Sequence, residues 1–263
     1  MPSKEMHTKV DCLGYSVFSA TLNQLPQKSK LLVNTINQYS YCIAEKDAGF
    51  KKALMESDVL LPDGVSMVLT ARLLHGKELK KIAGADLHEF LLDKVNSDKG
   101  RCFYLGSSQQ TLNKISEKIA VDYPQITLGT FSPPFKTKFS VADNHEMISV
   151  VNEFNPDVLF VGMTAPKQEK WSHTHVNQLN AKIICSIGAV FDFYAGTVQR
   201  PTEKWQNLGL EWLGRLIKEP KRMWQRYLRY GGVFCFYLLR AKFRLMRGSK
   251  KSEDVSASSD SVA

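Results

Sequence analysis

The sequence has few of the features that mark membrane-spanning, secreted or disulfide-bonded proteins. No run approaches the roughly 18 apolar residues that a transmembrane helix needs. The polar start, Met1–Asp11, lacks the apolar stretch of a secretory signal. The 5 cysteines contain no C-x-x-C pair, and their spacing suggests no disulfide framework. We therefore expect a protein of the reducing cytoplasm without a membrane span.

Several catalytic and cofactor motifs are also missing. There is neither G-x-G-x-x-G nor G-x-x-x-x-G-K-[ST], so the usual dinucleotide and P-loop sites lack their fingerprints. There is no G-x-S-x-G nucleophile elbow, and the lack of Asp-x-Asp disfavours sugar-nucleotide enzymes that hold a metal with that pair. No carboxylate cluster accompanies the His173-x-His175 pair. We expect no metal site and no cofactor.

What is present is an ordinary globular composition with an uneven charge distribution. Of 263 residues, 43% are hydrophobic and 23% are charged, which is enough to bury a core without disulfides or metals. The net charge of +9 is concentrated near the C-terminus, where residues 211–251 carry 12 Lys and Arg against 2 acids. This excess predicts an anionic partner for that segment, either a membrane surface or nucleic acid.

Short apolar runs alternate with segments of helical periodicity along most of the chain. The expected strands are Leu31–Thr35, Cys102–Leu105, Ile126–Phe131, Val158–Gly162 and Lys182–Ile187. The expected helices are Gln38–Met55, Val65–Leu74, Ala85–Val95, Gln109–Val121, Val141–Phe154 and Lys167–Leu179. Continuously apolar strands are typical of a parallel sheet covered on both faces. The pattern therefore predicts an open α/β architecture.

Near Arg200 the chain changes character, which predicts an appendage. From Thr202 it has helical periodicity, with a break at Pro220, and arginines alternate with aromatic residues. Aromatic and cationic side chains together favour a membrane interface. A helix packed on the body and a surface for single-stranded nucleic acid are the alternatives. We divide the chain into a core (1–200), a helical membrane-associating appendage (201–247) and a disordered Ser-rich tail (248–263).

Small and polar residues follow several of the expected strands. Thr35 and Asn37 stand at the end of the first, Gly106 and Gly162 end two others, and Asp192 lies just beyond the last. Ligands of open α/β sheets bind outside the carboxyl ends of the strands. Each loop alone could be ordinary turn chemistry, but several at matching strand ends favour a binding site.

The tripeptide Pro62-Asp63-Gly64 has two interpretations. Such a sequence is common in plain turns, and the residue types alone favour that interpretation. The alternative is a carboxylate at a strand-to-helix junction that acts as a general base.

Taken together, a series of ordered motifs resembles the WecG/TagA/CpsF family of bacterial glycosyltransferases. The resemblance extends from about Asp11 to Leu228. The motifs are Thr35-Ile36-Asn37, Leu61-Pro62-Asp63-Gly64, Ala83-Gly84-Ala85-Asp86-Leu87, Phe103-Tyr104-Leu105-Gly106, Ser132-Pro133-Pro134-Phe135, Pro166-Lys167-Gln168-Glu169, Phe191-Asp192-Phe193 with Ala195-Gly196, Gly209-Leu210-Glu211-Trp212, Arg215-Leu216 and Glu219-Pro220.

The resemblance implies an inverting, metal-independent enzyme on a Rossmann-like core. Members transfer a sugar from a UDP-sugar to a polyprenyl-diphosphate-linked sugar at the cytoplasmic face of the membrane, for bacterial surface polysaccharide. The best-known transfer is of N-acetylmannosamine, or its uronic acid, to undecaprenyl-diphospho-N-acetylglucosamine. The basic appendage would dock on the anionic membrane and help to close the site. Members can also self-associate through the core, which leaves room for a homo-oligomer, and nucleic acid is not expected as a partner.

The resemblance also implies roles for individual residues, and it favours the general-base interpretation of the Pro-Asp-Gly tripeptide. The catalytic pair would be Asp63, as general base, and Thr35, near the reacting sugars. Substrate binding would involve Asn37, Lys81, Asp86, Gly106, Gly162, Gln168, Glu169, Asp192, Arg215, Arg222 and Arg226. The three arginines would meet a diphosphate, which guanidinium groups bind in a bidentate way.

Two departures from the family pattern bear on these roles. Lys81 stands where members often have arginine. Lysine keeps the positive charge, but it cannot form the two parallel hydrogen bonds that a guanidinium group makes with one anionic group. Arg200-Pro201-Thr202 stands where members often have Arg-Ala-Pro. The alternatives are a UDP-hexose transferase with a different polyprenyl-diphosphate acceptor, a nucleotide-sugar-modifying Rossmann enzyme, and a protein whose basic tail binds nucleic acid.

Overall fold

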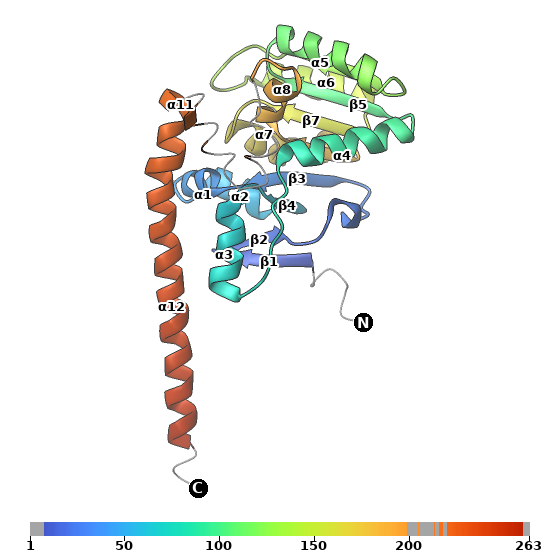
Figure 1. The fold of residues 1–263 in the computed structure, drawn as a ribbon. Coiled ribbons are helices and arrows are strands. Elements are labelled where there is room, and N and C mark those ends of the chain that lie inside the picture. The colour runs from blue at the N-terminus through green and yellow to red at the C-terminus, as the bar shows by residue number, and fades with distance from the viewer. Residues whose placement is uncertain (1–7, 199–204, 206–212, 214–215, 218–219, 260–263) are drawn as a thin grey trace.

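A six-stranded, fully parallel sheet forms the centre of the molecule. The structure, a computed structural model, describes residues 8–198, 205, 213, 216–217 and 220–259 (Figure 1). The strand order is β4-β3-β8-β7-β5-β6. The strands are β3 (Leu31–Ile36), β4 (Val59–Pro62), β5 (Arg101–Gly106), β6 (Thr127–Phe131), β7 (Val158–Gly162) and β8 (Ile183–Ser186). The predicted α/β class with an open parallel sheet is confirmed.

Helices cover both faces of the sheet and complete a three-layer core. They are α1 (Gln38–Ala44), α2 (Ala48–Met55), α3 (Val65–His75), α4 (Gly84–Ser97), α5 (Gln109–Asp122), α6 (Val141–Phe154), α7 (Lys167–His175) and α8 (Gly188–Tyr194), with short 3-10 turns at Leu22–Gln24 and Val176–Gln178. Helices α4, α5 and α8 pack on one face of the sheet. Helices α6 and α7 pack on the other. Strands that are buried on both faces explain the continuously apolar runs.

Several elements differ from the sequence-based prediction, among them α8, which was not predicted. The single helix expected over Gln38–Met55 is two helices, because Asp47 caps a new one by accepting a hydrogen bond from the Phe50 N–H. Strand β4 was not predicted, since four residues ending at a proline give little periodic signal. An antiparallel hairpin of β1 (Lys9–Cys12) and β2 (Tyr15–Phe18) was also missed. Its turn places Leu13 and Gly14 at positive φ, without the Asn-Gly pair that usually marks such turns.

The C-terminal segment packs one face on the core and leaves the other exposed. It consists of α11 (Pro220–Trp224), a π-helical turn η4 (Gln225–Arg229) and α12 (Tyr230–Ser259), which runs past α1 and α3 and continues beyond the body (Figure 1). Phe234 and Leu238 are buried in a cluster with α1, α3 and the hairpin. The expected break at Pro220 coincides with the start of α11. The packing alternative is thus correct for one face of α12.

The outer face of α12 is rich in apolar and basic side chains. Phe236, Leu239 and Phe243 are each exposed to about 60%. No helix among the described residues is long and apolar enough to cross a membrane. The helix continues through residues 248–259, where the sequence predicted disorder, because no proline interrupts it and its one glycine there is Gly248. The division into core, appendage and tail stays a prediction.

Candidate active site

Two adjoining clefts run along the carboxyl ends of the strands. The first, called here the β3–β8 cleft, is lined by Thr35, Asn37, Tyr39, Asp63, Gln168, Glu169, Ser186, Gly188, Asp192 and Arg226, among others. The second, called the β5–β7 cleft, is lined by Gly106, Ser107, Ser108, Phe135, Phe139, Gly162, Lys167, Gly188 and Asp192, among others. Because Thr164, Gly188 and Asp192 line both, the clefts form one continuous surface. A site at this edge agrees with the expectation for open α/β sheets.

Asp63 and Asn37 leave neighbouring strands side by side. Ile36 pairs with Pro62 at the ends of β3 and β4, and the Asp63 N–H donates to the Ile36 carbonyl at 2.9 Å. The Asn37 Nδ2 donates to the Asp63 Oδ2 at 3.4 Å. The Asn37 Oδ1 in turn accepts from the backbone N–H groups of Tyr39 and Ser40 and caps α1. The capping hydrogen bonds hold the Asn37 amide in place, and the amide in turn orients the Asp63 carboxylate.

The Pro-Asp-Gly tripeptide is a strand-to-helix junction. Pro62 ends β4, and Gly64 precedes the first residue of α3 with φ of +115°. Only glycine adopts such a φ without strain, so Gly64 lets the chain turn directly after Asp63. Asp63 therefore stands at the junction of strand and helix, where it lines the β3–β8 cleft. Its role as a general base stays a prediction.

Gln168 and Glu169 are buried beneath the β3–β8 cleft. The Gln168 Oε1 accepts from the N–H of Met163 and of Gly188, which joins the loops after β7 and β8. Its Nε2 donates to the Glu169 Oε1 at 2.9 Å. The Glu169 Oε2 has no hydrogen-bond partner among the described residues, and burial raises the pKa of this carboxyl to about 7. Gln168 therefore connects two loops at the cleft, and its contact with a substrate stays a prediction.

Two glycines form the floor of the β5–β7 cleft. Gly106 and Gly162 are partners in the pairing of β5 with β7. A Cβ on Gly106 would lie 2.2 Å from the Gly162 carbonyl oxygen, and the φ of Gly106 is +118°. Ser108 begins α5 by accepting from the Thr111 N–H. Two glycines and a helix N-terminus are features of phosphate-binding surfaces.

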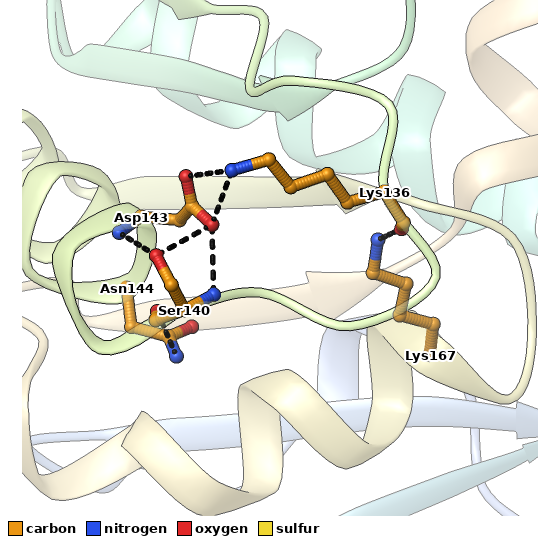
Figure 2. A network of polar contacts seen from close by, with 5 residues as sticks. All are labelled: Lys136, Ser140, Asp143, Asn144 and Lys167. Atoms are coloured by element: carbon orange, nitrogen blue, oxygen red, sulfur yellow. Dashed lines mark hydrogen bonds and ion pairs between the residues drawn. The ribbon is translucent and has the colours of Figure 1, made fainter.

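The loop between β6 and α6 forms one wall of the β5–β7 cleft and is held by a polar network (Figure 2). Lys136 forms an ion pair with Asp143 at 2.8 Å, and this contact, with hydrogen bonds from Ser140, lowers the pKa of Asp143 to about 2. Ser140 caps α6 and also donates to Asp143. Lys167 donates to the Lys136 carbonyl and lies 3.5 Å from the Phe139 ring centroid. The loop is thus tied to both α6 and α7.

Arg226 connects the C-terminal segment to the β3–β8 cleft. Its guanidinium lies 4.6 Å from the centroid of the Tyr39 ring, and both residues line the cleft. The π-helical turn that carries Arg226 is a rare form of helix that often occurs at functional sites. Arg215 and the side chain of Arg222 lie outside the described residues.

Other expected site residues have different positions. Lys81 lines a separate groove beside Asp63 rather than either cleft. Asp86 accepts from the Ala83 N–H at 2.9 Å and caps α4, and it is not among the lining residues of the two clefts. Sequence reasoning missed Tyr39 and Lys167. The only available signals were an aromatic residue two positions after Asn37 and a lysine at the start of α7.

A metal ion has no candidate site among the described residues, which contain no group of three or more His, Cys, Asp or Glu side chains that could hold one. The carboxyl groups that line the clefts are those of Asp63, Glu169 and Asp192, and the cations are those of Arg226 and Lys167.

Comparison with known proteins gives consistent matches over most of the chain. Residues 4–248 match the family described as "Glycosyl transferase WecG/TagA/CpsF family". An N-acetylglucosaminyldiphosphoundecaprenol N-acetyl-beta-D-mannosaminyltransferase of Bacillus subtilis (strain 168) is 31% identical over 204 residues, which cover 78% of this chain and 77% of that protein. A protein of the same name from Staphylococcus aureus (strain MW2) is 22% identical over 249 residues, 91% of this chain and 95% of that one.

Proposed function

The chain belongs to the WecG/TagA/CpsF family of glycosyltransferases, and we propose that it transfers N-acetylmannosamine, or its uronic acid, from a UDP-sugar to undecaprenyl-diphospho-N-acetylglucosamine. The acceptor follows from the names of the relatives. The observation that carries the proposal is the Asp63 carboxylate, oriented by Asn37 at the edge of the β3–β8 cleft.

The proposed reaction is a single inverting displacement. Asp63 takes the proton from the acceptor hydroxyl as its oxygen attacks the anomeric carbon of the donor sugar. The new carbon–oxygen bond forms as the bond from that carbon to the UDP oxygen breaks, and UDP leaves with the electron pair. Thr35, on the cleft wall beside Asn37, would hold the reacting sugars. Attack from the face opposite the leaving group inverts the anomeric configuration.

The donor nucleotide is assigned to the β5–β7 cleft. Support comes from the glycine floor, from the N-terminus of α5, and from Asp192 and Thr164, which the two clefts share. Arg226 would stabilise diphosphate charge near the acceptor side. We propose that these groups stabilise the departing charge without a metal ion, in keeping with the absence of Asp-x-Asp from the sequence.

The enzyme would work at the cytoplasmic face of the membrane as a peripheral protein. The exposed aromatic and aliphatic residues of α12 alternate with Arg240, Arg244 and Arg247. Apolar groups at headgroup depth and cations on anionic lipid would hold this helix to the surface that carries the acceptor.

The decisive experiment measures UDP release from a panel of UDP-sugars with a short-chain prenyl-diphospho-N-acetylglucosamine acceptor, with chelator present. Acceptor-dependent release with UDP-N-acetylmannosamine supports the proposal, and loss of at least about a thousandfold in Asp63→Asn supports the base. Asp98→Asn, an exposed residue that lines neither cleft, is the control. Release that requires added divalent metal would contradict metal independence, and wild-type turnover in Asp63→Asn would contradict the base.

A further inference from the structure

A third hollow, the α3–α12 groove, opens from the β3–β8 cleft between helix α3 and the C-terminal helix. Asn37 and Asp63 line both hollows, so the groove begins at the carboxylate assigned as the base. Lys81 also lines the groove, and the hydrogen bond from the next residue, Ile82, to the Pro62 carbonyl at 3.0 Å places it near Asp63. Gln38, Ser66 and Tyr227 add polar groups to the lining. Most of the other side chains are apolar or weakly polar, namely Val65, Leu69, Leu228, Phe234, Cys235 and Leu238.

The two helices that form the walls are fixed in place. Phe234 and Leu238 anchor α12 in the core cluster, and the Lys242 Nζ donates to the Leu73 carbonyl at 2.8 Å, beyond the groove. The lining runs from Tyr227 to Leu238, which is roughly 16 Å at about 1.5 Å per residue. Side chains along its rim remain in contact with solvent, since Leu69 is 47% exposed and Leu228 is 60% exposed. The groove is therefore a preformed apolar channel with open space above it.

Gly231 lines the groove between Leu228 and Phe234. Apart from its chain neighbours and the backbone of its own helix, no atom lies within 4 Å of the position that a Cβ on Gly231 would occupy. The neighbouring Gly232 also faces open space, but it is exposed and does not line the groove. Glycine is unfavourable inside a helix, so a side chain at either position favours the helix and meets no obstacle.

We propose that the α3–α12 groove binds the first isoprene units of the lipid-linked acceptor, with its diphosphate near Lys81. This inference rests on the proposed function, because it uses the chemistry of the proposed acceptor. The acceptor has a charged diphosphate joined to an apolar chain. The groove has a cation, Lys81, next to an apolar channel. The groove leads from Asp63 along α3 to the exposed Leu69, and along α12 to Leu238. The remaining isoprene units would continue from there into the membrane.

Cys235 gives a direct measurement of occupancy. It is the one exposed cysteine, and the four others are buried, with thiol pKa values raised by burial. A maleimide should therefore label Cys235 selectively. In vesicle-free buffer, farnesyl-diphospho-N-acetylglucosamine at about ten times its Kd should slow labelling about tenfold. The methyl-diphospho analogue should not. Unchanged labelling with the farnesyl compound, or equal protection by a phospholipid, would overturn the assignment.

Gly231→Leu provides the second measurement, with Gly232→Leu as its matched control. Filling the groove should lower the ratio of kcat/KM for the farnesyl acceptor over the methyl acceptor by at least about tenfold. Gly232→Leu should leave the ratio at the wild-type value. Equal ratios in the two variants would overturn the assignment. A wild-type enzyme that transfers to neither acceptor would contradict the proposed function instead, and the labelling of Cys235 would still decide whether the groove binds a prenyl chain.

Discussion

Asn37 uses the two ends of its side-chain amide for two different tasks. Its oxygen accepts from the Tyr39 and Ser40 N–H groups at the start of α1, and its nitrogen donates to the Asp63 Oδ2 at 3.4 Å. One residue thus joins the capping of a helix to the orientation of the proposed base. The two tasks can be separated by substitution.

Asn37→Asp should keep the cap and lose the support of Asp63. A carboxylate accepts the same backbone hydrogen bonds, but it cannot donate to Asp63 and would repel it. We expect kcat to fall about 10- to 100-fold with a nearly unchanged melting temperature. Asn37→Ala should in addition lose about 1 kcal/mol of stability. Thermal unfolding and UDP release measure the two effects, and equal stability loss in both variants would contradict the separation.

Glu169→Gln should change how stability depends on pH. The pKa of Glu169 is about 7 in the folded protein against an ordinary value of 4.5, so between these values the folded protein binds more protons than the unfolded chain. The free energy of unfolding contributed by this group therefore falls as pH rises through this window. Above pH 7 the variant should be more stable than wild type, by at most about 3 kcal/mol.

Urea unfolding of both proteins at pH 5, 6, 7 and 8 tests this expectation, because the contributions of other groups cancel in the difference. A difference that is constant across the range would show that Glu169 titrates normally. In the Glu169→Gln variant, Gln168 can still donate to the side-chain oxygen at position 169. The contacts by which Gln168 connects the two loops are therefore preserved.

Arg226 and Tyr39 should act as a coupled pair. The guanidinium lies over the Tyr39 ring, and a contact of this kind contributes about 0.5–2 kcal/mol. Arg226→Lys should raise KM for the acceptor about tenfold, since lysine keeps the charge but cannot form the bidentate hydrogen bonds of a guanidinium group. A double-mutant cycle with Tyr39→Leu should give a coupling energy of about 1 kcal/mol. Arg229→Lys, in the same turn but outside the cleft, is the control, and strict additivity would contradict the coupling.

Gly106→Ala should destabilise the core by about 3 kcal/mol or more. The added Cβ would overlap the Gly162 carbonyl oxygen, and the backbone at +118° strains any other residue. Gly76→Ala is the matched control, since Gly76 also has positive φ but faces open space. We expect it to cost only about 1 kcal/mol. Similar losses in the two variants, measured by urea unfolding, would show that the close approach of β5 to β7 is not required.

The sequence alone was sufficient for the fold class and for the edge of the sheet at which the candidate site lies. Continuously apolar strands can only be buried on both faces, so their alternation with helices predicts a parallel sheet. Ligands of open α/β sheets bind at the carboxyl ends of the strands, and Thr35 and Asn37 stand at the end of an expected strand. The interpretation of Asp63 needed the family resemblance, because Pro-Asp-Gly is chemically suited to a plain turn as well.

Other features depended on contacts that periodicity does not reveal. The hairpin, the division between α1 and α2, and the capping role of Asp86 are decided by local hydrogen bonds. The Gln168 side chain accepts hydrogen bonds from the loops that follow two different strands. Arg226 contacts Tyr39, which is far from it in the sequence.

The α3–α12 groove illustrates the same limit at the scale of whole helices. Its walls exist because Phe234 and Leu238 enter the cluster formed by α1, α3 and the hairpin. The sequence determined that this segment would be a basic, aromatic-rich helix. Only tertiary packing decided which face of that helix is buried, because an aromatic-rich helix has apolar residues on several faces and the shape of its partner selects among them.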